Sequence, residues 1–194
     1  MTDPDLFGDR MPDLDGARVR LRHPRPTDAD AVFAIFGDEQ AMRYWSHEAF
    51  ETRAQAVDYL RAIDEGFAER TFCQWAITER GADELIGTVT LTGWDERNRR
   101  MELGYMLSPS KWGRGLAGEA VRAVLRFGFE RIGLHRVEAE LDPRNAASAR
   151  LLKRLGFREE GLLRERWWVY EEWCDSALYG LLRRDFDHAP PGAT

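Results

Sequence analysis

The sequence has few of the residues that would assign it to a specialised class of protein. Its 194 residues contain two cysteines, Cys73 and Cys174, which lie far apart and show neither CxxC nor metal-ligand spacing. No apolar run approaches the ~18 residues that a membrane span requires. The acidic N-terminus lacks the apolar segment of a signal peptide. We therefore expect reduced thiols, no membrane partner and a cytoplasmic location.

Basic residues are outnumbered by acidic ones, 28 Lys and Arg against 34 Asp and Glu. The formal net charge is -6, whereas domains that bind nucleic acid usually carry a basic surface. We expect no nucleic-acid partner, and the acidic balance fits a cationic molecule better. The histidines form no zinc-binding pattern, so we expect no metal. They are His23, His47, His135 and His188.

The remaining composition is that of an ordinary globular protein, with 43% hydrophobic and 32% charged residues. The length suits one domain, and the chain shows neither a linker nor a repeat. We expect a flexible acidic arm at residues 1–15, a single domain at residues 16–187 and a flexible tail at residues 188–194.

Hydrophobic spacing predicts a mixture of strands and helices. Apolar residues at every second position predict strands, and spacings of three and four predict helices. Two capping boxes, Thr27–Asp30 and Thr52–Gln55, mark the starts of two helices. The expected strands are 18–23, 72–79, 84–94, 99–107, 135–142 and two within 166–182; the other two helices follow the glycine-rich turn described next and Asn145. The order β-α-α-β-β-β-α-β-α-β-β predicts an α+β or α/β fold with helices against a sheet.

A glycine-rich turn, KWGRGLAGEA at residues 111–120, joins a predicted strand to a predicted helix. Backbone N–H groups converge at a helix start, where the helix dipole adds roughly half a positive charge. Gly113, Gly115 and Gly118 leave room for a ligand to approach the main chain. We interpret the turn as a phosphate cradle, because a tight corner would need fewer glycines. Neither the Walker A pattern nor GxGxxG is present.

Three motifs in this order resemble a known family. The first is Trp112–Ala117 followed by Glu119-Ala120, the second is Asn145–Ser148 followed by Lys153–Phe157, and the third is Trp173-Cys174-Asp175. Together they resemble the GNAT N-acetyltransferases, and among them the RimJ/RimL-like branch that acetylates protein N-termini. Trp112 departs from the Gln or Arg that the wider superfamily carries at this position. The resemblance covers roughly residues 17–186.

The resemblance implies an α+β, three-layer fold with a mixed, mostly antiparallel sheet of about seven strands, splayed central strands and four helices. It also implies acetyl-CoA or CoA as co-substrate. The pantetheine arm would add to the strand edge near Leu107, as an extra strand does. Lys153 would meet a phosphate, or else lie on a solvated helix face. The residues expected to bind the co-substrate are Met106, Leu107, Trp112, Gly113, Arg114, Gly115, Leu116, Ala117, Gly118, Asn145 and Lys153.

The resemblance assigns the catalytic residues as Glu102 and Ser148. Alternation places Glu102 opposite Met101 and Leu103, beside the expected cleft, where it would deprotonate the amine, directly or through a water. The alternative is a surface carboxylate paired with Arg99 or Arg100. Many family members carry a tyrosine acid at the position of Leu152, which this chain lacks. Ser148 would instead hydrogen-bond the departing thiolate, or simply pack in a helix turn.

Aromatic residues crowd the last predicted hairpin. Trp167, Trp168, Tyr170 and Trp173 alternate across it, so at least one should face the acceptor groove, with Tyr44 and Trp45. Packing in the core or in a dimer is the alternative. The family resemblance and the aromatic content also suggest a homodimer.

We therefore expect an acetyl-CoA-dependent N-acetyltransferase that acts on a primary amine, and we favour the N-terminal amine of a protein. A small amine such as an antibiotic, a polyamine or an amino sugar is the alternative acceptor. A non-catalytic acyl-CoA sensor would keep the cradle and lose the acid and base groups. A phosphate-binding enzyme of another fold would bind ATP or NAD in place of CoA.

Overall fold

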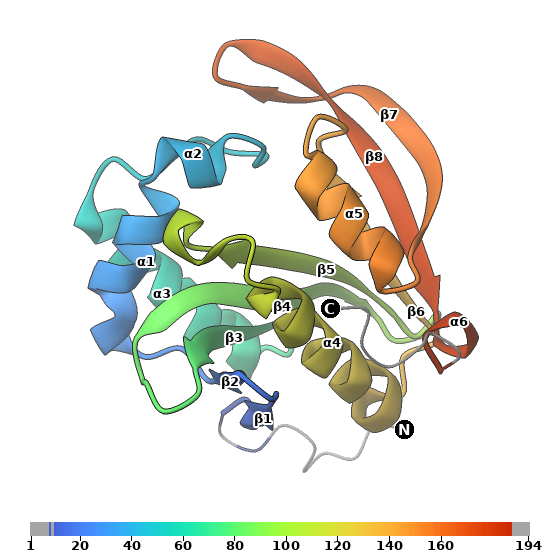
Figure 1. The fold of residues 1–194 in the computed structure, drawn as a ribbon, viewed down its shortest axis with the longest axis horizontal. Helices are drawn as coiled ribbons and strands as arrows, with labels where there is room; N and C mark the ends of the chain where they lie inside the picture. Colours follow the sequence, from blue (N-terminus) through green and yellow to red (C-terminus); the bar gives the residue numbers. More distant parts are fainter. Residues whose placement is uncertain (1–7, 9, 188–194) are drawn as a thin grey trace.

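One eight-stranded sheet runs through the protein in the order β1-β2-β3-β4-β5-β6-β8-β7 (Figure 1). All neighbouring strands are antiparallel except β5 and β6, which run parallel. The computed structural model describes residue 8 and residues 10–187. The strands are β1 (Leu14–Asp15), β2 (Val19–Arg22), β3 (Phe72–Glu79), β4 (Leu85–Asp95), β5 (Arg100–Leu107), β6 (Arg136–Leu141), β7 (Arg158–Val169) and β8 (Glu172–Leu182). The predicted strands are confirmed, although β7 begins well before residue 166 and β1 is an additional short strand.

Helices cover both faces of the sheet, which gives the predicted three layers. Met106 packs in a buried cluster with α1 and α3, and the neighbouring Leu107 packs in a second cluster with α4 and α5. Successive side chains of each strand therefore pack alternately into two separate hydrophobic cores, one on each face of the sheet. The helices are α1 (Ala29–Phe36), α2 (Glu39–Met42), α3 (Arg53–Ala68), α4 (Leu116–Phe127), α5 (Ala146–Arg154) and α6 (Arg183–Asp187). Among the described helices, none is long and apolar enough to cross a membrane.

A buried ion pair joins β2 to the start of α1. The Arg22 guanidinium donates to both oxygens of Asp28, at 2.8 and 2.7 Å, and the Arg22 side chain is 3% exposed. The predicted capping box at Thr27 is wrong, because Thr27 lies in a 3-10 turn and α1 starts after Asp28 without a side-chain cap. The box at Thr52 is confirmed, since Gln55 Oε1 accepts from the Thr52 backbone nitrogen at 2.9 Å.

The segment before β2 packs against the sheet. Met11 is 1% exposed, and the Trp75 indole donates to the Pro12 carbonyl at 2.9 Å. Residues 11–15 therefore belong to the folded domain, and the predicted arm at residues 1–15 is too long. Residues 1–7 and 9 of that arm, and the predicted tail at 188–194, lie outside the described residues.

The two central strands diverge soon after they meet. β5 and β6 pair at three positions, residues 100–102 against residues 136–138. Beyond them β5 continues to Leu107 beside β4, and β6 continues to Leu141 beside β8. This confirms the predicted splay. The divergence opens the sheet between β5 and β6, while each of these strands stays paired with its other neighbour.

We predict that Arg22→Ala destabilises the protein by about 3–5 kcal/mol, because it leaves the buried Asp28 carboxylate without its partner. The free energy of unfolding in urea measures this. Arg61→Ala is the matched control, since it breaks an ion pair with Asp58 whose side chains are 62% and 66% exposed. An exposed pair contributes about 1 kcal/mol or less. Equal losses in the two variants would contradict the prediction.

Candidate active site

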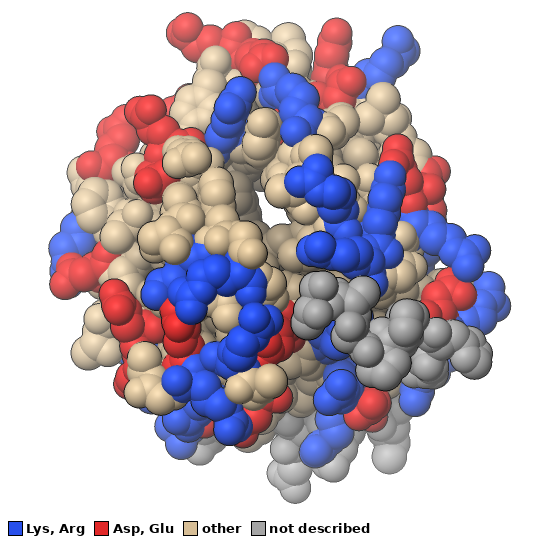
Figure 2. Space-filling model, viewed as in Figure 1, with Lys and Arg blue, Asp and Glu red and all other residues tan. Residues whose placement is uncertain are grey.

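A cavity of about 170 Å³ lies where β5 and β6 diverge. Its walls come from β5, β6, the start of α5, the segment after α2 and the β7–β8 hairpin. Figure 2 shows the molecule hollowed between α2 and α5 at this position. The predicted site residues Glu102, Asn145 and Ser148 all line it. A larger hollow of about 500 Å³ borders the Arg22–Asp28 ion pair and contains none of the predicted site residues.

The edge of β5 presents backbone groups to this opening. Ser108 donates to the Ile86 carbonyl at 2.9 Å, and Met106 is paired with Thr88 of β4. Backbone N–H groups point alternately to the two neighbouring strands. The N–H of Met106 therefore points to β4, whereas the N–H groups of Leu103, Tyr105 and Leu107 point to the side of β6. The Leu107 carbonyl accepts from the Trp112 indole at 2.7 Å. Of the two predicted edge residues, Leu107 directs its backbone N–H away from β4 and Met106 directs its own toward β4; neither residue lines the cavity itself.

Glu102 projects into the cavity without a partner. Among the described residues its carboxylate makes neither a hydrogen bond nor an ion pair. Arg100, its expected alternative partner, pairs with Glu138 and Asp95 instead. Glu102 is exposed to the cavity, yet partial desolvation raises the pKa of its carboxyl; the negative charges of Glu140 and Glu138 raise it further, while Arg166 opposes them. A carboxylate of this kind accepts a proton more readily than an ordinary surface glutamate.

Most other carboxylates around the cavity are neutralised. Glu140 accepts from the Ser176 hydroxyl at 3.0 Å and lies 3.9 Å from Arg166. Asp142 pairs with Arg144 at 2.6 Å. Asp175 accepts from the Glu165 backbone nitrogen at 2.8 Å but has no ion pair among the described residues. Glu102 and Asp175 are therefore the carboxylates of the described cavity wall that can meet an incoming cation.

Ser148 lies on the other side of β5 and is held by two contacts. Asn145 caps α5, because its side-chain oxygen accepts from the Ser148 backbone nitrogen at 3.1 Å. The Ser148 hydroxyl lies 2.5 Å from the hydroxyl of Tyr105, which projects from β5. Leu152 follows one helical turn after Ser148 and also lines the cavity. Ser148 is thus brought to β5, and Asn145 lines the same cavity, whereas Lys153 does not.

The glycine-rich turn ends at an uncapped helix. Gly113 and Gly115 have φ of 72° and 75°, which only glycine adopts without strain. Gly115 is the N-cap of α4 and supplies no side-chain cap, and Gly118 follows in the first turn. A Cβ on Gly113 or Gly118 would meet nothing within 4 Å. The turn therefore has open space at Gly113 and Gly118, whereas a Cβ on Gly115 would meet the Arg18 guanidinium at 3.2 Å.

Cations flank the turn and α5 on the same face. Figure 2 shows lysine and arginine side chains over α5 and over the segment before α4. Lys111 and Arg114 both pair with Glu79, at 2.6 and 3.0 Å, and their hydrogen bonds lower the pKa of that carboxyl. Lys153 pairs with Glu159 at 3.2 Å. Its contact with a phosphate stays a prediction.

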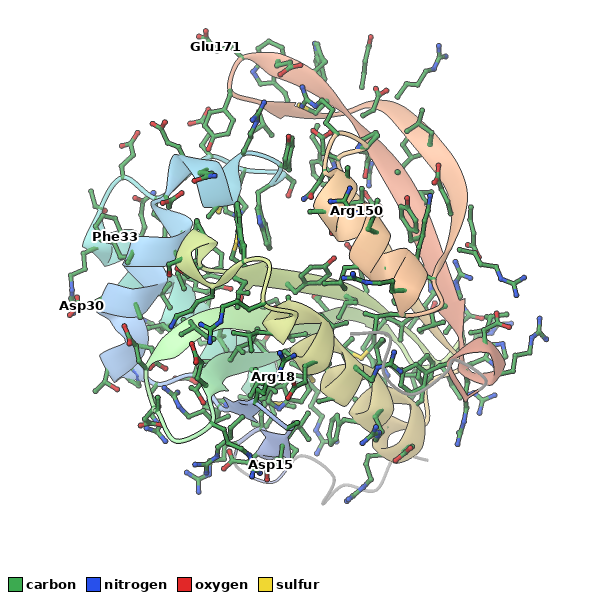
Figure 3. All side chains as sticks on the ribbon, in the orientation of Figure 1. Asp15, Arg18, Asp30, Phe33, Arg150 and Glu171 are labelled. Atoms are coloured by element: carbon green, nitrogen blue, oxygen red, sulfur yellow. The ribbon has the colours of Figure 1, made fainter. Side chains whose placement is uncertain are left out.

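Arg18 and Glu119 lock β2 to the first turn of α4. The Glu119 carboxylate accepts from the Arg18 and Val19 backbone nitrogens, at 2.5 and 3.2 Å, and pairs with the Arg18 guanidinium. Figure 3 shows Arg18 beside this turn. Glu119 of the first motif thus has a structural contact, because it holds the first turn of α4 against β2.

The β7–β8 hairpin closes one side of the cavity. Figure 1 shows the hairpin arching from α5 toward α2, and Figure 3 places Glu171 at its tip. There the Tyr170 hydroxyl accepts from the Ala49 backbone nitrogen at 3.0 Å. Trp167 lines the cavity together with Tyr44 and Trp45, as predicted. Trp168 and Trp173 are instead exposed and pack on each other, with ring centres 5.2 Å apart.

Sequence reasoning missed Tyr105 as a functional group of the cavity wall. Tyr105 carried a signal, since alternation places it opposite Glu102, but no local pattern showed that Ser148 would meet it. Cys174 lines the cavity and accepts from Arg144 at 3.2 Å. Among the described residues, His, Cys, Asp and Glu side chains form no group of three or more that could hold a metal ion.

Comparison with known proteins identifies the class. Residues 18–158 match the model of the acetyltransferase (GNAT) domain. The N-acetyltransferase YoaA of Bacillus subtilis, itself uncharacterized, is 33% identical over 173 residues, which cover 89% of this chain and 98% of YoaA. The spermidine N(1)-acetyltransferase of Escherichia coli is 25% identical over 178 residues, 91% of this chain and 93% of that enzyme.

The structure of Mycobacterium smegmatis RimJ in complex with CoA-disulfide has the same fold. Its TM-score is 0.82 at 24% identity, and the match covers 92% of this chain and 90% of that chain. The chain belongs to the GNAT acetyltransferases and is a GNAT N-acetyltransferase, which uses acetyl-CoA.

We predict that Gly118→Ala has opposite effects on stability and on CoA binding. Alanine stabilises a helix by roughly 0.5–1 kcal/mol relative to glycine, and its Cβ meets nothing in the free protein. The same Cβ would occupy space that a pyrophosphate needs, so the Kd for CoA should rise at least about tenfold. Urea unfolding and calorimetric titration measure the two effects.

Ala54→Gly, in the exposed first turn of α3, is the matched control. It should lower the free energy of unfolding by a similar amount and leave the Kd for CoA unchanged. An unchanged Kd in Gly118→Ala would contradict a ligand at this turn.

Proposed function

We propose that this enzyme acetylates the N-terminal amine of a protein, as RimJ/RimL-like enzymes do, by direct transfer in a ternary complex. One observation carries the proposal: the partner-free Glu102 and the Tyr105–Ser148 pair line a single cavity from the two faces of β5. Such an arrangement suits a reaction that removes a proton from one reactant and stabilises a leaving group on the other.

Acetyl-CoA supplies the acetyl group as a thioester, and the residues present fit it. The open space at Gly113 and Gly118 and the uncapped start of α4 suit a pyrophosphate. Lys111 and Arg114 would exchange Glu79 for phosphate oxygens. The edge of β5 at Leu107 and Tyr105 would receive the amides of the pantetheine arm. Asn145 would act from the facing side of the cavity.

Each catalytic residue then has one task. Glu102 takes a proton from the ammonium, directly or through a water, because only the free amine attacks. A strand N–H near Leu107 stabilises the charge that develops on the thioester oxygen. Ser148 donates a hydrogen bond to the sulfur. In the transfer the amine nitrogen bonds the acetyl carbon, and the carbon–sulfur bond breaks with its electron pair on sulfur. Of the two protons that the amine loses, one reaches solvent through Glu102 and one ends on sulfur.

The cavity supports an acceptor with one buried amine. About 170 Å³ accommodates an amino group and a short side chain, while the rest of a polypeptide stays outside. The Trp167, Tyr44 and Trp45 side chains offer apolar walls to that first residue.

A polyamine is the second candidate acceptor. Asp175 has no ion pair within the described part of the chain and lines the same cavity as Glu102, so the two carboxylates could hold two ammonium groups of one molecule. The related spermidine N(1)-acetyltransferase makes this candidate worth testing.

We expect CoA release when acetyl-CoA is incubated with peptides that carry a free N-terminus, and little release with the same peptides blocked at that end. Thiol titration measures turnover, with spermidine and lysine-rich blocked peptides as the other arms. Faster turnover of spermidine would replace the protein acceptor with the polyamine. Both CoA and acetyl-CoA should raise the melting temperature, whereas ATP and NAD should not. Absence of any shift with CoA would overturn the proposed function.

We predict that Glu102→Gln lowers kcat/KM by about 10²–10⁴-fold while CoA affinity stays unchanged. Glu102 works in its ionised form, so the rate of the wild-type enzyme falls as the pH falls through its pKa. That pKa is raised, so this acid limb lies above the ~4.3 of an ordinary glutamate. The limb should be absent from the pH profile of the variant.

Two neighbouring variants sharpen this test. Glu140→Gln removes a negative charge that raises the pKa of Glu102, so the acid limb should move to lower pH. Glu138→Gln is the control for a carboxylate already paired with Arg100 and Arg136, at 2.9 and 2.8 Å. It should reduce kcat/KM far less than Glu102→Gln. A wild-type rate in Glu102→Gln would exclude Glu102 as the base.

A further inference from the structure

Two hydroxyl groups meet at the wall of the cavity where β5 faces α5. The Tyr105 hydroxyl lies 2.5 Å from the Ser148 hydroxyl, and both residues line the cavity. The Tyr105 ring packs against the buried cluster beneath α4 and α5. The Asn145 cap fixes the backbone of Ser148. The pair is therefore held from both of its elements.

The chemistry of the pair decides which hydroxyl donates. Each hydroxyl has one proton to donate and lone pairs that accept. A phenol is far more acidic than an aliphatic alcohol, so Tyr105 is the stronger donor of the two. Its other neighbour, the Ser148 carbonyl, lies at 3.5 Å, beyond a normal O–H···O distance. With Tyr105 as donor, the proton of Ser148 is left for another acceptor.

We propose that Tyr105 is a positioning residue that donates to Ser148 and thereby directs the Ser148 proton to the sulfur that leaves in acetyl transfer. This inference rests on the proposed function, in which Ser148 contacts that sulfur. The step involves hydrogen bonds from Tyr105 to Ser148 and from Ser148 to sulfur, and neither residue loses its proton for good. The proton that finally resides on sulfur comes from the amine.

The structure explains why a second residue is needed. Leu152 stands where many family members carry a tyrosine, one helical turn after Ser148, and it is 1% exposed. Tyr105 brings a phenol to the same part of the cavity from β5 instead of from α5. Burial raises the pKa of Tyr105 to about 12, so its hydroxyl remains a donor at every pH at which amines are acetylated.

The first readout is binding and does not require turnover. A thiolate accepts a stronger hydrogen bond than a thiol, so the Ser148 donor should favour the ionised form of CoA. The affinity for CoA should therefore rise by about tenfold from about pH 7 to about pH 10, relative to desulfo-CoA, which has no sulfur to ionise. Calorimetric titration at a series of pH values measures this ratio.

Other groups near the cavity titrate or carry charge, and the design must separate them. Cys174 of β8 is a thiol, so all proteins in the comparison carry Cys174→Ser. The charges of Glu102, Glu140, Asp142, Asp175, Arg144 and Arg166 act on CoA and desulfo-CoA alike, apart from their effect on the sulfur. They are present in every variant, so they cancel when variants are compared.

Tyr105→Phe keeps the ring and removes the hydroxyl. We expect it to abolish most of the rise in CoA affinity with pH, to lower kcat about tenfold or more, and to leave the KM for acetyl-CoA unchanged. Ser148→Ala should have the same effects on CoA affinity, kcat and KM, because it removes the hydroxyl that accepts from Tyr105. This second variant tests the pair even if Tyr105→Phe folds poorly. Tyr179→Phe is the control, since it removes the hydroxyl of a tyrosine that bonds Glu159 outside the cavity.

The outcomes separate the two proposals. Loss of the pH dependence in Ser148→Ala with wild-type behaviour in Tyr105→Phe would overturn the role of Tyr105 and leave the proposed function intact. Wild-type behaviour in both variants would overturn the role of the pair. Failure of the wild-type protein to bind CoA would overturn the proposed function itself. Loss in both variants, with Tyr179→Phe unchanged, would support Tyr105 as the positioning residue.

Discussion

The short pairing of β5 with β6 is the constraint on which the rest of the structure depends. The ladder holds for three residue pairs, and both strands then continue with other neighbours. A complete ladder would keep the strands about 4.8 Å apart and use the amides of Leu103, Tyr105 and Leu107. Because it stops at Glu102, Tyr105 lines a cavity, and Ser148 of α5 can approach Tyr105 of β5.

The same divergence separates two electrostatic environments. The face that carries α4 and α5 has an uncapped helix start and the cations Lys111, Arg114 and Lys153, which pair with Glu79 and Glu159. The opposite face of β5 and β6 carries Glu102, Glu138 and Glu140, of which Glu102 has no partner among the described residues. An anionic co-substrate and a cationic acceptor would therefore approach the cavity from different faces, with the reacting atoms between them.

Much of this was readable from local patterns. Alternation in residues 99–107 predicted that Glu102 and Tyr105 point to opposite faces, because side chains alternate along any strand. The glycines after Trp112 predicted an open helix start, and the Thr52 capping box predicted where α3 begins. The Thr27 box failed because the cap forms two residues earlier, where the Asp28 carboxylate accepts from the Arg25 backbone nitrogen at 2.7 Å. The prediction of a flexible arm failed at residues 11–15, because Met11 and Pro12 are held by contacts with distant parts of the chain.

The sequence by itself determined the order of the elements, the faces of each strand and the glycine-rich start of α4, because these depend on residues within a few positions of one another. Only the tertiary structure decided which side chains meet across the cavity. Ser148 lies 43 positions from Tyr105, and Lys111 lies 32 from Glu79. Whether such side chains touch depends on the angle at which β5 and β6 diverge and on the position of α5 against the sheet. Both are set by packing of the whole core.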